Sequence, residues 1–294
     1  MKPPQTFTVD VKGGELTVVR WGEGPKIVLG IHGITASSML FLAIAERMGP
    51  DVSLVAPDLR GRGESSAVRG PYGMAQHADD CAAVLDSLGG EATLILGVSM
   101  GAYVGVMLAA RRPDLVERLV LVDGGLPLPL PEGTDPMELA EALLGPSLDR
   151  LRMTFPSFEK YLDFWREHPA VAETWNEHAE AYLAYDLTGS EPELRSRVSE
   201  EAIRADMLDS IGKPRQIDEA LDTLTCPVFL LRATRGLLNG PPLMPEELVA
   251  VWRERIPQLE DELIDDTNHY SIVLGERGAQ AIVDRVQETT EVAG

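Results

Sequence analysis

The stretch from residue 92 to residue 112 constrains the fold most. A short apolar run, residues 92–96, leads into the pattern Gly-x-Ser-x-Gly over residues 97–101, and an apolar segment follows that ends before Pro113. Side chains at positions 97 and 101 would collide with neighbouring chain in a sharp strand-to-helix turn, which explains the two glycines. The stretch therefore predicts a strand, a strained turn with Ser99 at its apex, and a helix whose N-terminus favours negative charge beside the hydroxyl.

Apolar runs and helical patterns alternate along most of the chain. Residues 26–31 form a near-continuous apolar run of the kind that is buried on both faces of a parallel sheet. Further strands are expected at residues 7–11 and 16–21 (an antiparallel hairpin), 52–56, 118–122, 228–231 and 258–264, and helices at residues 37–48, 74–88, 245–255 and 278–287. This alternation predicts an α/β fold with a mostly parallel, doubly wound sheet of about eight strands.

The sheet pattern is interrupted between residues 126 and 222, where helical patterns follow one another without a convincing strand. We expect this segment to be a helical cap inserted into a core that residues 1–125 and 223–294 form. The aromatic side chains of Phe158, Tyr161 and Trp165 share one helical face. They form either the core of the insertion or part of a substrate cavity, and the sequence leaves both interpretations open.

The composition is typical of a globular protein that stays in solution, with 44% hydrophobic and 25% charged residues. A formal net charge of −21 argues against partners such as nucleic acid or an anionic membrane surface. No apolar run has the length of a signal-peptide core or of a membrane span. We therefore expect a cytoplasmic protein that acts on a small molecule, and the sequence leaves a homodimer open.

The two cysteines give little indication of chemistry. Cys81 falls on the apolar face of the helix expected over residues 74–88, and Cys226 lies just ahead of a strand. Two buried free thiols in a reducing compartment are the interpretation we favour, and a disulfide stays open. No Cys/His spacing indicates a metal site, so we expect no cofactor.

Four polar side chains follow predicted parallel strands at the point where each strand ends: His32, Ser99, Asp123 and His269. Because the carboxyl ends of parallel strands meet at one edge of a sheet, chemistry is expected where these residues gather. Three of them occur in the order Ser, Asp, His. That order is typical of one of the known arrangements of a serine nucleophile with its base and acid.

The chain resembles the α/β-hydrolase fold superfamily, and within it the esterase- or lactonase-like subgroup that has a serine nucleophile and a helical cap. Residues 97–101 are similar to the nucleophile elbow of that family, and His32-Gly33 to its oxyanion loop. Residues 58–65 match the stretch D-x-R-G-x-G-x-S, and Asn268-His269-Tyr270 resembles the catalytic-histidine loop. The four motifs occur in the family's order over nearly the whole chain.

The candidate catalytic residues are Ser99, His269 and Asp123. A serine hydroxyl is a weak nucleophile until a base within hydrogen-bond reach takes its proton, and His269 is the candidate base. A carboxylate must then orient the imidazole and stabilise its cation. Many relatives place this acid after the penultimate strand, but residues 232–240 contain no carboxylate. We therefore expect Asp123, one strand earlier, with Glu246 or Glu247 as alternatives.

The resemblance also implies residues that bind the substrate. The backbone N–H groups of Ile34 and Met100 would form the oxyanion hole, and His32 would shape the oxyanion loop by hydrogen bonding. The expected substrate-binding residues are His32, Phe158, Tyr161, Trp165 and Tyr270.

The other polar residues near these motifs are expected to be structural or solvated. Arg60, Arg62 and Glu64 would hold the loop of residues 58–65 beside the site. We expect solvated or surface positions for His77, Asp79, Asp80, His168 and His178.

A serine at the elbow excludes the halide- and epoxide-opening mechanisms that need an aspartate nucleophile there. The expected reaction is hydrolysis of a carboxylic ester or lactone of a small to medium apolar substrate, through an acyl-enzyme on Ser99. The alternatives on the same scaffold are hydrolysis of a C–C bond in a β-diketone-like substrate, amide hydrolysis and cofactor-free oxygenation. A receptor-like relative that binds its ligand with little turnover is an alternative of another class.

Overall fold

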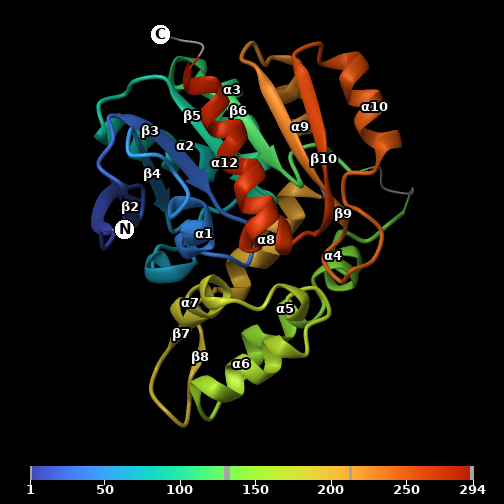
Figure 1. The fold of residues 1–294 in the computed structure, drawn as a ribbon. Coiled ribbons are helices and arrows are strands. Elements are labelled where there is room, and N and C mark those ends of the chain that lie inside the picture. Colours follow the sequence, from blue (N-terminus) through green and yellow to red (C-terminus); the bar gives the residue numbers. More distant parts are fainter. Residues whose placement is uncertain (1, 129–132, 212–213, 292–294) are drawn as a thin grey trace.

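The computed structural model describes residues 2–128, 133–211 and 214–291. Its centre is an eight-stranded sheet in the order β1-β2-β4-β3-β5-β6-β9-β10 (Figure 1). The strands are β1 (Gln5–Val11), β2 (Gly14–Trp21), β3 (Lys26–Ile31), β4 (Val52–Pro57), β5 (Thr93–Val98), β6 (Val116–Val122), β9 (Val228–Arg235) and β10 (Leu259–Asn268). β2 pairs antiparallel with β1 and β4, and the other neighbouring strands are parallel. The predicted α/β fold with a mostly parallel sheet is thus confirmed.

Helices cover both faces of the sheet because the central strands are apolar on both sides. Every residue of β4 and β5 is buried. Successive residues of one strand, such as Ile95 and Leu96, belong to two different hydrophobic clusters. One cluster includes side chains of α2 (Met74–Ser87), α3 (Met100–Arg111), α9 (Pro214–Asp222) and α10 (Glu246–Arg255), and the other includes α1 (Leu42–Ala45), α11 (Ser271–Leu274) and α12 (Glu276–Glu291).

The helix expected over residues 37–48 is shorter in the structure. A 3₁₀-helix, η1 (Ser38–Phe41), precedes the single turn of α1. Near the C-terminus, the one helix expected from residue 278 is preceded by the separate short helix α11. Boundaries of this kind depend on tertiary packing, because short apolar segments satisfy several local structures equally well.

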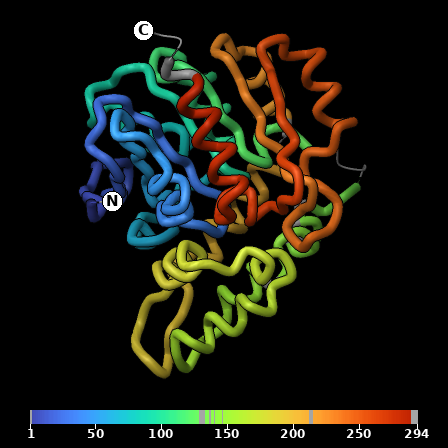
Figure 2. Tube along the Cα trace, in the orientation of Figure 1, coloured from blue at the N-terminus to red at the C-terminus, as the bar shows by residue number. Residues whose placement is uncertain are grey.

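The segment between β6 and β9 carries helices α4 (Pro136–Leu144), α5 (Pro146–Asp149), α6 (Phe158–Arg166), α7 (Glu177–Asp186) and α8 (Glu200–Ser210). Figures 1 and 2 show α6 and α7 in a lobe that projects from one end of the core, with α8 where the lobe meets the core.

Two details of the insertion differ from the expectation. Strands β7 (Leu187–Thr188) and β8 (Arg195–Ser196) form an antiparallel ribbon, so the expected absence of strands was wrong. Strands of two residues are too short to produce an alternating pattern. In addition, α9 packs against α3, so the last helix of residues 126–222 covers the core sheet and lies outside the lobe.

The structure keeps Cys81 and Cys226 free and buried, which agrees with the thiol interpretation. Burial raises the pKa of both thiols. In the part of the chain that the structure describes, no helix combines the length and the apolar composition that crossing a membrane would require.

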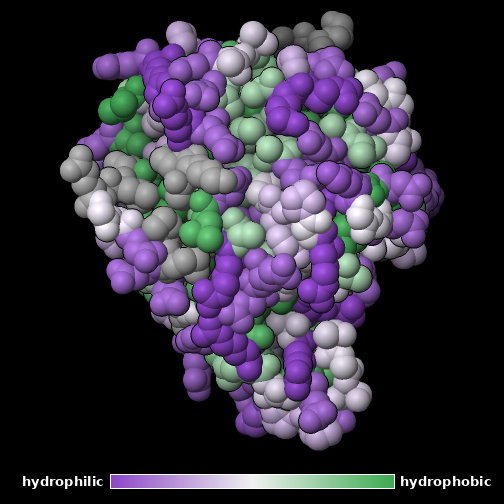
Figure 3. All heavy atoms as spheres, turned by 180° about the vertical axis from the view of Figure 1, so that it is seen from behind, coloured by the Kyte–Doolittle hydropathy of each residue, from purple (hydrophilic) through white to green (hydrophobic). Residues whose placement is uncertain are grey.

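Hydrophilic side chains predominate on the molecular surface seen in Figure 3.

The turn between β5 and α3 is as sharp as the sequence predicts. Ser99 adopts φ 54° and ψ −118°, a backbone conformation that residues other than glycine rarely adopt. A Cβ at Gly101 would lie 1.9 Å from the carbonyl oxygen of Ile31, and a Cβ at Gly97 would lie 2.5 Å from the carbonyl oxygen of Gly101. Both glycines are therefore required because backbone of β3 and α3 occupies the space of a side chain.

This crowding predicts a large difference between two glycines of the same helix. We expect Gly101→Ala to lower the free energy of unfolding by at least about 3 kcal/mol, since rigid backbone blocks the added methyl group. Gly105→Ala is the control, because its Cβ would meet side-chain methyl groups and no backbone: Cγ2 of Ile95 at 3.3 Å and Cδ2 of Leu119 at 3.6 Å. We expect the control to change stability by no more than about 1 kcal/mol. Urea denaturation followed by circular dichroism measures both, and equal losses would contradict the explanation.

Candidate active site

Strand pairing continues past the end of β5 and places Ser99 beside Asp123. The N–H of Ser99 donates to the carbonyl oxygen of Val122 at 2.9 Å, and the N–H of Asp123 donates to the carbonyl oxygen of Leu231 at 2.8 Å. A Cβ at Gly124 would lie 2.5 Å from the carbonyl oxygen of Ser99. The ends of three neighbouring strands, β5, β6 and β9, are thus packed tightly against one another.

The carboxylate of Asp123 is fixed by two hydrogen bonds. Its Oδ2 lies 2.7 Å from Nδ1 of His269, and its Oδ1 accepts from the N–H of Ala233 at 3.2 Å. Asp123 itself has φ 48°, a second strained residue at this edge of the sheet. Since an ionised carboxylate only accepts, Nδ1 of His269 carries the proton in this pair, and Nε2 keeps a lone pair that can take a proton.

The hydroxyl of Ser99 is available for chemistry. In the described part of the chain, no hydrogen bond joins this hydroxyl to His269 or to any other group. Hydrogen bonds of this kind are often long in ligand-free sites and shorten when substrate binds. The structure thus joins Asp123 to His269 by a hydrogen bond and places Asp123 beside Ser99, while among the described residues no hydrogen bond joins Ser99 to His269.

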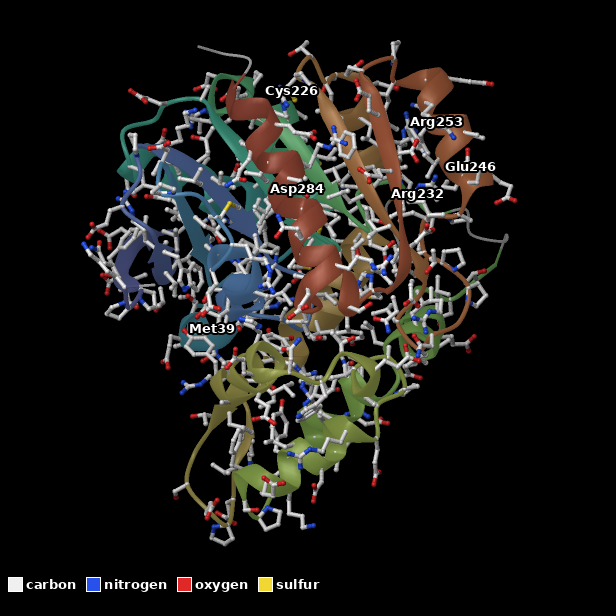
Figure 4. The ribbon with its side chains drawn as sticks, viewed as in Figure 1. Met39, Cys226, Arg232, Glu246, Arg253 and Asp284 are labelled. Carbon is white, nitrogen blue, oxygen red and sulfur yellow. The ribbon has the colours of Figure 1, made fainter. Side chains whose placement is uncertain are left out.

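The alternative carboxylates are engaged elsewhere. Glu246, which follows Pro245 at the start of α10, pairs with Arg232 at 2.7 Å and also with Arg253. Figure 4 shows these three side chains together on β9 and α10. No interaction among the described residues joins Glu246 or Glu247 to His269, so Asp123 is the carboxylate that holds the imidazole here.

The loop after β3 is held by His32. Its Nε2 accepts from the N–H of Leu59 at 3.0 Å, which requires the proton to sit on Nδ1, and Nδ1 donates to the carbonyl oxygen of Gly33 at 2.8 Å. Burial, partly offset by that bond, lowers the pKa of His32 to about 3. The imidazole is fully buried, so its expected role in shaping the loop fits the geometry, whereas the expected contact with substrate does not.

The peptide between Gly33 and Ile34 is oriented by these contacts. The carbonyl oxygen of Gly33 also accepts from the N–H of Ala36 at 3.2 Å. In a trans peptide the N–H points away from the carbonyl oxygen, so the N–H of Ile34 points away from His32. That N–H has no acceptor among the described residues. The N–H of Met100, in the first turn of α3, likewise has no acceptor within the helix. Both amides are therefore free to bind an oxyanion.

A cavity of about 80 Å³ lies beside Ser99. Its walls come from the loop after β3, the start of α3, the insertion and the loop between β9 and α10. The lining residues are Ile34, Ser99, Met100, Tyr103, Asp123, Leu128, Leu143, Leu144, Met207, Ser210, Ile211, Leu237, Leu243 and Met244. The lining is almost entirely apolar. Sequence analysis missed the residues of the insertion and of the β9–α10 loop because isolated Leu and Met residues carry no local signal of a cavity.

The aromatic residues of the insertion do not line this cavity. Tyr161 and Trp165 are buried and pack edge-to-face with ring centroids 6.4 Å apart, and Phe158 is 36% exposed. Tyr270 packs against Trp165, and its hydroxyl lies 2.9 Å from the hydroxyl of Ser147. None of these four side chains lines the cavity beside Ser99, so the structure does not support their expected substrate-binding roles. The core of the insertion, which was the open alternative for Tyr161 and Trp165, is what these two residues form.

The aromatic residues of the insertion pack around a buried arginine, Arg150. The guanidinium of Arg150 lies over the ring of Trp165, 5.2 Å from its centroid, and pairs with Asp186. The hydroxyl of Tyr161 donates to the same carboxylate. Nη2 of Arg150 donates to the carbonyl oxygen of Thr35 at 2.9 Å. The cluster thus supports an arginine that reaches from the insertion to Thr35 in the loop after β3.

Several polar residues expected at the surface are buried. Asp80 pairs with Arg60, and His77 pairs with Asp206 of α8. His168 is buried between Trp165 and Tyr270, and burial lowers its pKa to about 4. These expectations were wrong because Arg60, Asp206 and Tyr270, which contact these side chains, lie far from them along the chain. Asp79 is exposed, as expected, and His178 is partly exposed. No group of three metal-binding side chains occurs among the described residues.

Comparisons with known proteins define the class. Residues 28–285 match the alpha/beta hydrolase family, so the chain belongs to that family. Lipase LipV of Mycobacterium tuberculosis (strain ATCC 25618 / H37Rv) is 34% identical over 154 residues, which cover 52% of this chain and 57% of LipV. The 2-(acetamidomethylene)succinate hydrolase of Mesorhizobium japonicum (strain LMG 29417 / CECT 9101 / MAFF 303099) is 35% identical over 115 residues, 39% of this chain and 41% of that one. The chain thus spans 57% and 41% of the length of these two curated relatives.

Whole-chain similarity is seen with solved structures. The crystal structure of E-2-(acetamidomethylene)succinate hydrolase superposes with a TM-score of 0.78 and 22% identity, over 97% of this chain and all of that one. At this identity the likeness concerns the fold alone.

The environment of His32 predicts a dependence of stability on pH. Because the folded state holds His32 neutral down to about pH 3, the unfolded chain alone binds its proton between that pH and the ordinary histidine pKa near 6.5. The free energy of unfolding therefore falls as pH falls through this window, by up to about 1.4 kcal/mol per pH unit from this group.

His32→Gln tests this dependence, since glutamine also offers a donor and an acceptor but does not titrate. We expect the variant to be less stable than wild type at pH 7.5 and to lose less stability between pH 6 and pH 4. Urea denaturation over this pH series gives the two slopes. Parallel curves would mean that His32 does not stay neutral in the folded protein.

Proposed function

We propose that this chain is a serine esterase that hydrolyses a carboxylic ester, open-chain or lactone, through an acyl-enzyme on Ser99. The observation that carries the proposal is the hydrogen bond between Asp123 and His269, next to a strained serine whose hydroxyl is unbound. A protonated Nδ1 leaves Nε2 of His269 as the base. The lipase among the relatives supports the ester as the bond that is cleaved.

The proposed reaction follows from the positions of these groups. As Oγ of Ser99 attacks the ester carbonyl carbon, its proton moves to Nε2 of His269. Asp123 stabilises the resulting imidazolium through the bond to Nδ1. The negative charge on the carbonyl oxygen is bound by the N–H groups of Ile34 and Met100. When the tetrahedral intermediate collapses, the C–O bond to the alcohol breaks and His269 returns the proton to the departing oxygen.

Water completes the cycle by hydrolysing the acyl-enzyme. His269 removes a proton from water as its oxygen attacks the acyl carbon, and the proton then returns to Oγ of Ser99 as the acid is released. Removing a single oxyanion donor in a related site typically raises the barrier by about 2.7–4 kcal/mol. The two free amides are therefore expected to contribute as strongly as the base.

The cavity indicates the acyl group. An apolar cavity of about 150 Å³ is large enough for benzene, and the cavity beside Ser99 measures about 80 Å³. The described residues that line it include no lysine, arginine or histidine. We infer an acyl chain of a few carbons without charge. The relative named 2-(acetamidomethylene)succinate hydrolase is named for a dicarboxylate. The cavity beside Ser99 has no cationic side chain among its described lining residues to pair with a carboxylate.

Substitution at two positions tests the mechanism. We expect Ser99→Ala to lower kcat by about 10⁴-fold or more, with the fold intact, because the acyl-enzyme cannot form. Asp123→Asn should also lower kcat by about 10⁴-fold, since the amide favours the wrong tautomer of His269. Glu246→Gln is the matched control and should retain most of the activity. Steady-state kinetics with p-nitrophenyl butyrate gives the ranking. An unchanged rate for Ser99→Ala, or a greater loss for Glu246→Gln, would refute the mechanism.

The charge of the acyl chain provides a separate test. We expect p-nitrophenyl pentanoate to be hydrolysed at least about 100-fold more efficiently, in kcat/KM, than the ester of equal length whose acyl chain ends in a carboxylate. Burying that carboxylate without a partner would cost a few kcal/mol. The p-nitrophenyl esters of acetate and decanoate test in addition how the rate depends on the length of the acyl chain. Equal efficiency for the neutral and the charged ester would show that the acyl chain does not enter this cavity.

A further inference from the structure

The geometry points to Arg62 as a positioning residue for the oxyanion hole, held in place by Asp206 of α8. This inference rests on the proposed function, because it takes the N–H of Ile34 as an oxyanion donor. The loop of residues 58–65 supplies Arg62, whose side chain is fully buried. Arg62 Nε donates to the carbonyl oxygen of Ile34 at 3.0 Å.

Two side chains together fix the backbone at Ile34. The peptide before its Cα carries the donor N–H, and His32 holds the carbonyl oxygen of that peptide. The peptide after its Cα carries the carbonyl oxygen that Arg62 binds. With both peptide planes held, the dihedral angles at Ile34 are defined, and so is the direction of the N–H. Because an oxyanion donor must lie within a few tenths of an ångström of its place, this orientation bears directly on the rate.

Arg62 is itself held from the insertion. Nη2 of Arg62 lies 2.6 Å from Oδ2 of Asp206, and Nη1 donates to the carbonyl oxygen of Arg60 at 2.9 Å. The same Oδ2 lies 2.9 Å from Nε2 of His77. Oδ1 of Asp206 accepts from the N–H of Gly73 at 2.7 Å. These contacts leave the guanidinium one arrangement, in which Nε faces Ile34.

The helix that supplies Asp206 also forms part of the cavity wall. Met207 and Ser210 of α8 line the cavity, and the hydroxyl of Ser210 donates to the backbone carbonyl oxygen of Asp206 at 2.8 Å. In Figure 1, α8 lies where the lobe meets the core. The ion pair therefore couples the wall that contacts the acyl chain to the amide that binds the oxyanion, two parts of the site that come from different segments of the chain.

Arg60 provides a matched comparison on the same loop. It is also fully buried, and it binds both oxygens of the buried Asp80 at 2.7 Å. Its remaining bonds go to the carbonyl oxygens of Arg69 and Lys12. Arg60 thus resembles Arg62 in burial and in ion pairing but does not contact the oxyanion loop. A purely structural role for Arg62 would make substitutions at the two positions equivalent.

Arg62→Lys and Arg60→Lys test the inference. Both variants keep a positive charge but lose the planar fork, so both are expected to be less stable than wild type. We expect Arg62→Lys to lower kcat with p-nitrophenyl butyrate by about 10- to 100-fold, with KM changed by less than about threefold because the acyl pocket is intact. An alkyl boronic acid, which forms a tetrahedral adduct with an active serine, should bind the variant more weakly by a similar factor.

Arg60→Lys should keep kcat and boronic acid affinity within about threefold of wild type. All assays are run at a temperature at which thermal unfolding shows each variant to be folded. If Arg62→Lys does not fold, Asp206→Asn and Asp80→Asn make the same comparison through the two carboxylates. Equal effects on kcat at the two positions, or a loss of kcat that is only as large as the fall in Tm predicts, would overturn the inference. Full activity of Ser99→Ala would instead refute the proposed function, so the two failures are distinguishable.

Discussion

The bond from the N–H of Ser99 to the carbonyl oxygen of Val122 is the contact on which the site depends. It extends the pairing of β5 and β6 beyond the strands and sets Ser99 next to Asp123, the residue that follows Val122. The pairing is possible because Gly101 allows α3 to start against β3. Asp123 in turn reaches His269, which follows the edge strand β10. Distant segments of the chain meet because parallel strands end at the same edge.

Buried polar contacts join the insertion to the loop after β3. Arg150 binds the carbonyl oxygen of Thr35, and Asp206 holds the arginine that binds the carbonyl oxygen of Ile34. Burying these charged groups costs free energy, and an ion pair together with hydrogen bonds to the backbone offsets that cost for each group. The aromatic residues that surround Arg150 thus have a structural purpose. The cavity beside Ser99 is lined instead by leucine and methionine side chains from other parts of the insertion and from the loop between β9 and α10.

The fold could be predicted from the sequence because its signals are local. Continuous apolar runs marked the buried strands, and the glycines at 97 and 101 marked the turn. The same is true of Asp123, whose position followed from the end of β6. Buried ion pairs could not be predicted, since His77 and Asp80 look solvated until α8 and the loop of residues 58–65 pack against α2. Nor could the cavity be predicted, because its apolar lining comes from single residues of several segments.

The central claim is that Ser99 is chemically activated by its surroundings, and labelling with a fluorophosphonate tests it most directly. The reagent reacts with activated serines and leaves ordinary hydroxyl groups unmodified. We expect peptide mass spectrometry of the wild-type chain to show a single adduct on Ser99, and Asp123→Asn to label far more slowly. Absence of an adduct, or an adduct on another serine with Ser99 unmodified, would contradict the account.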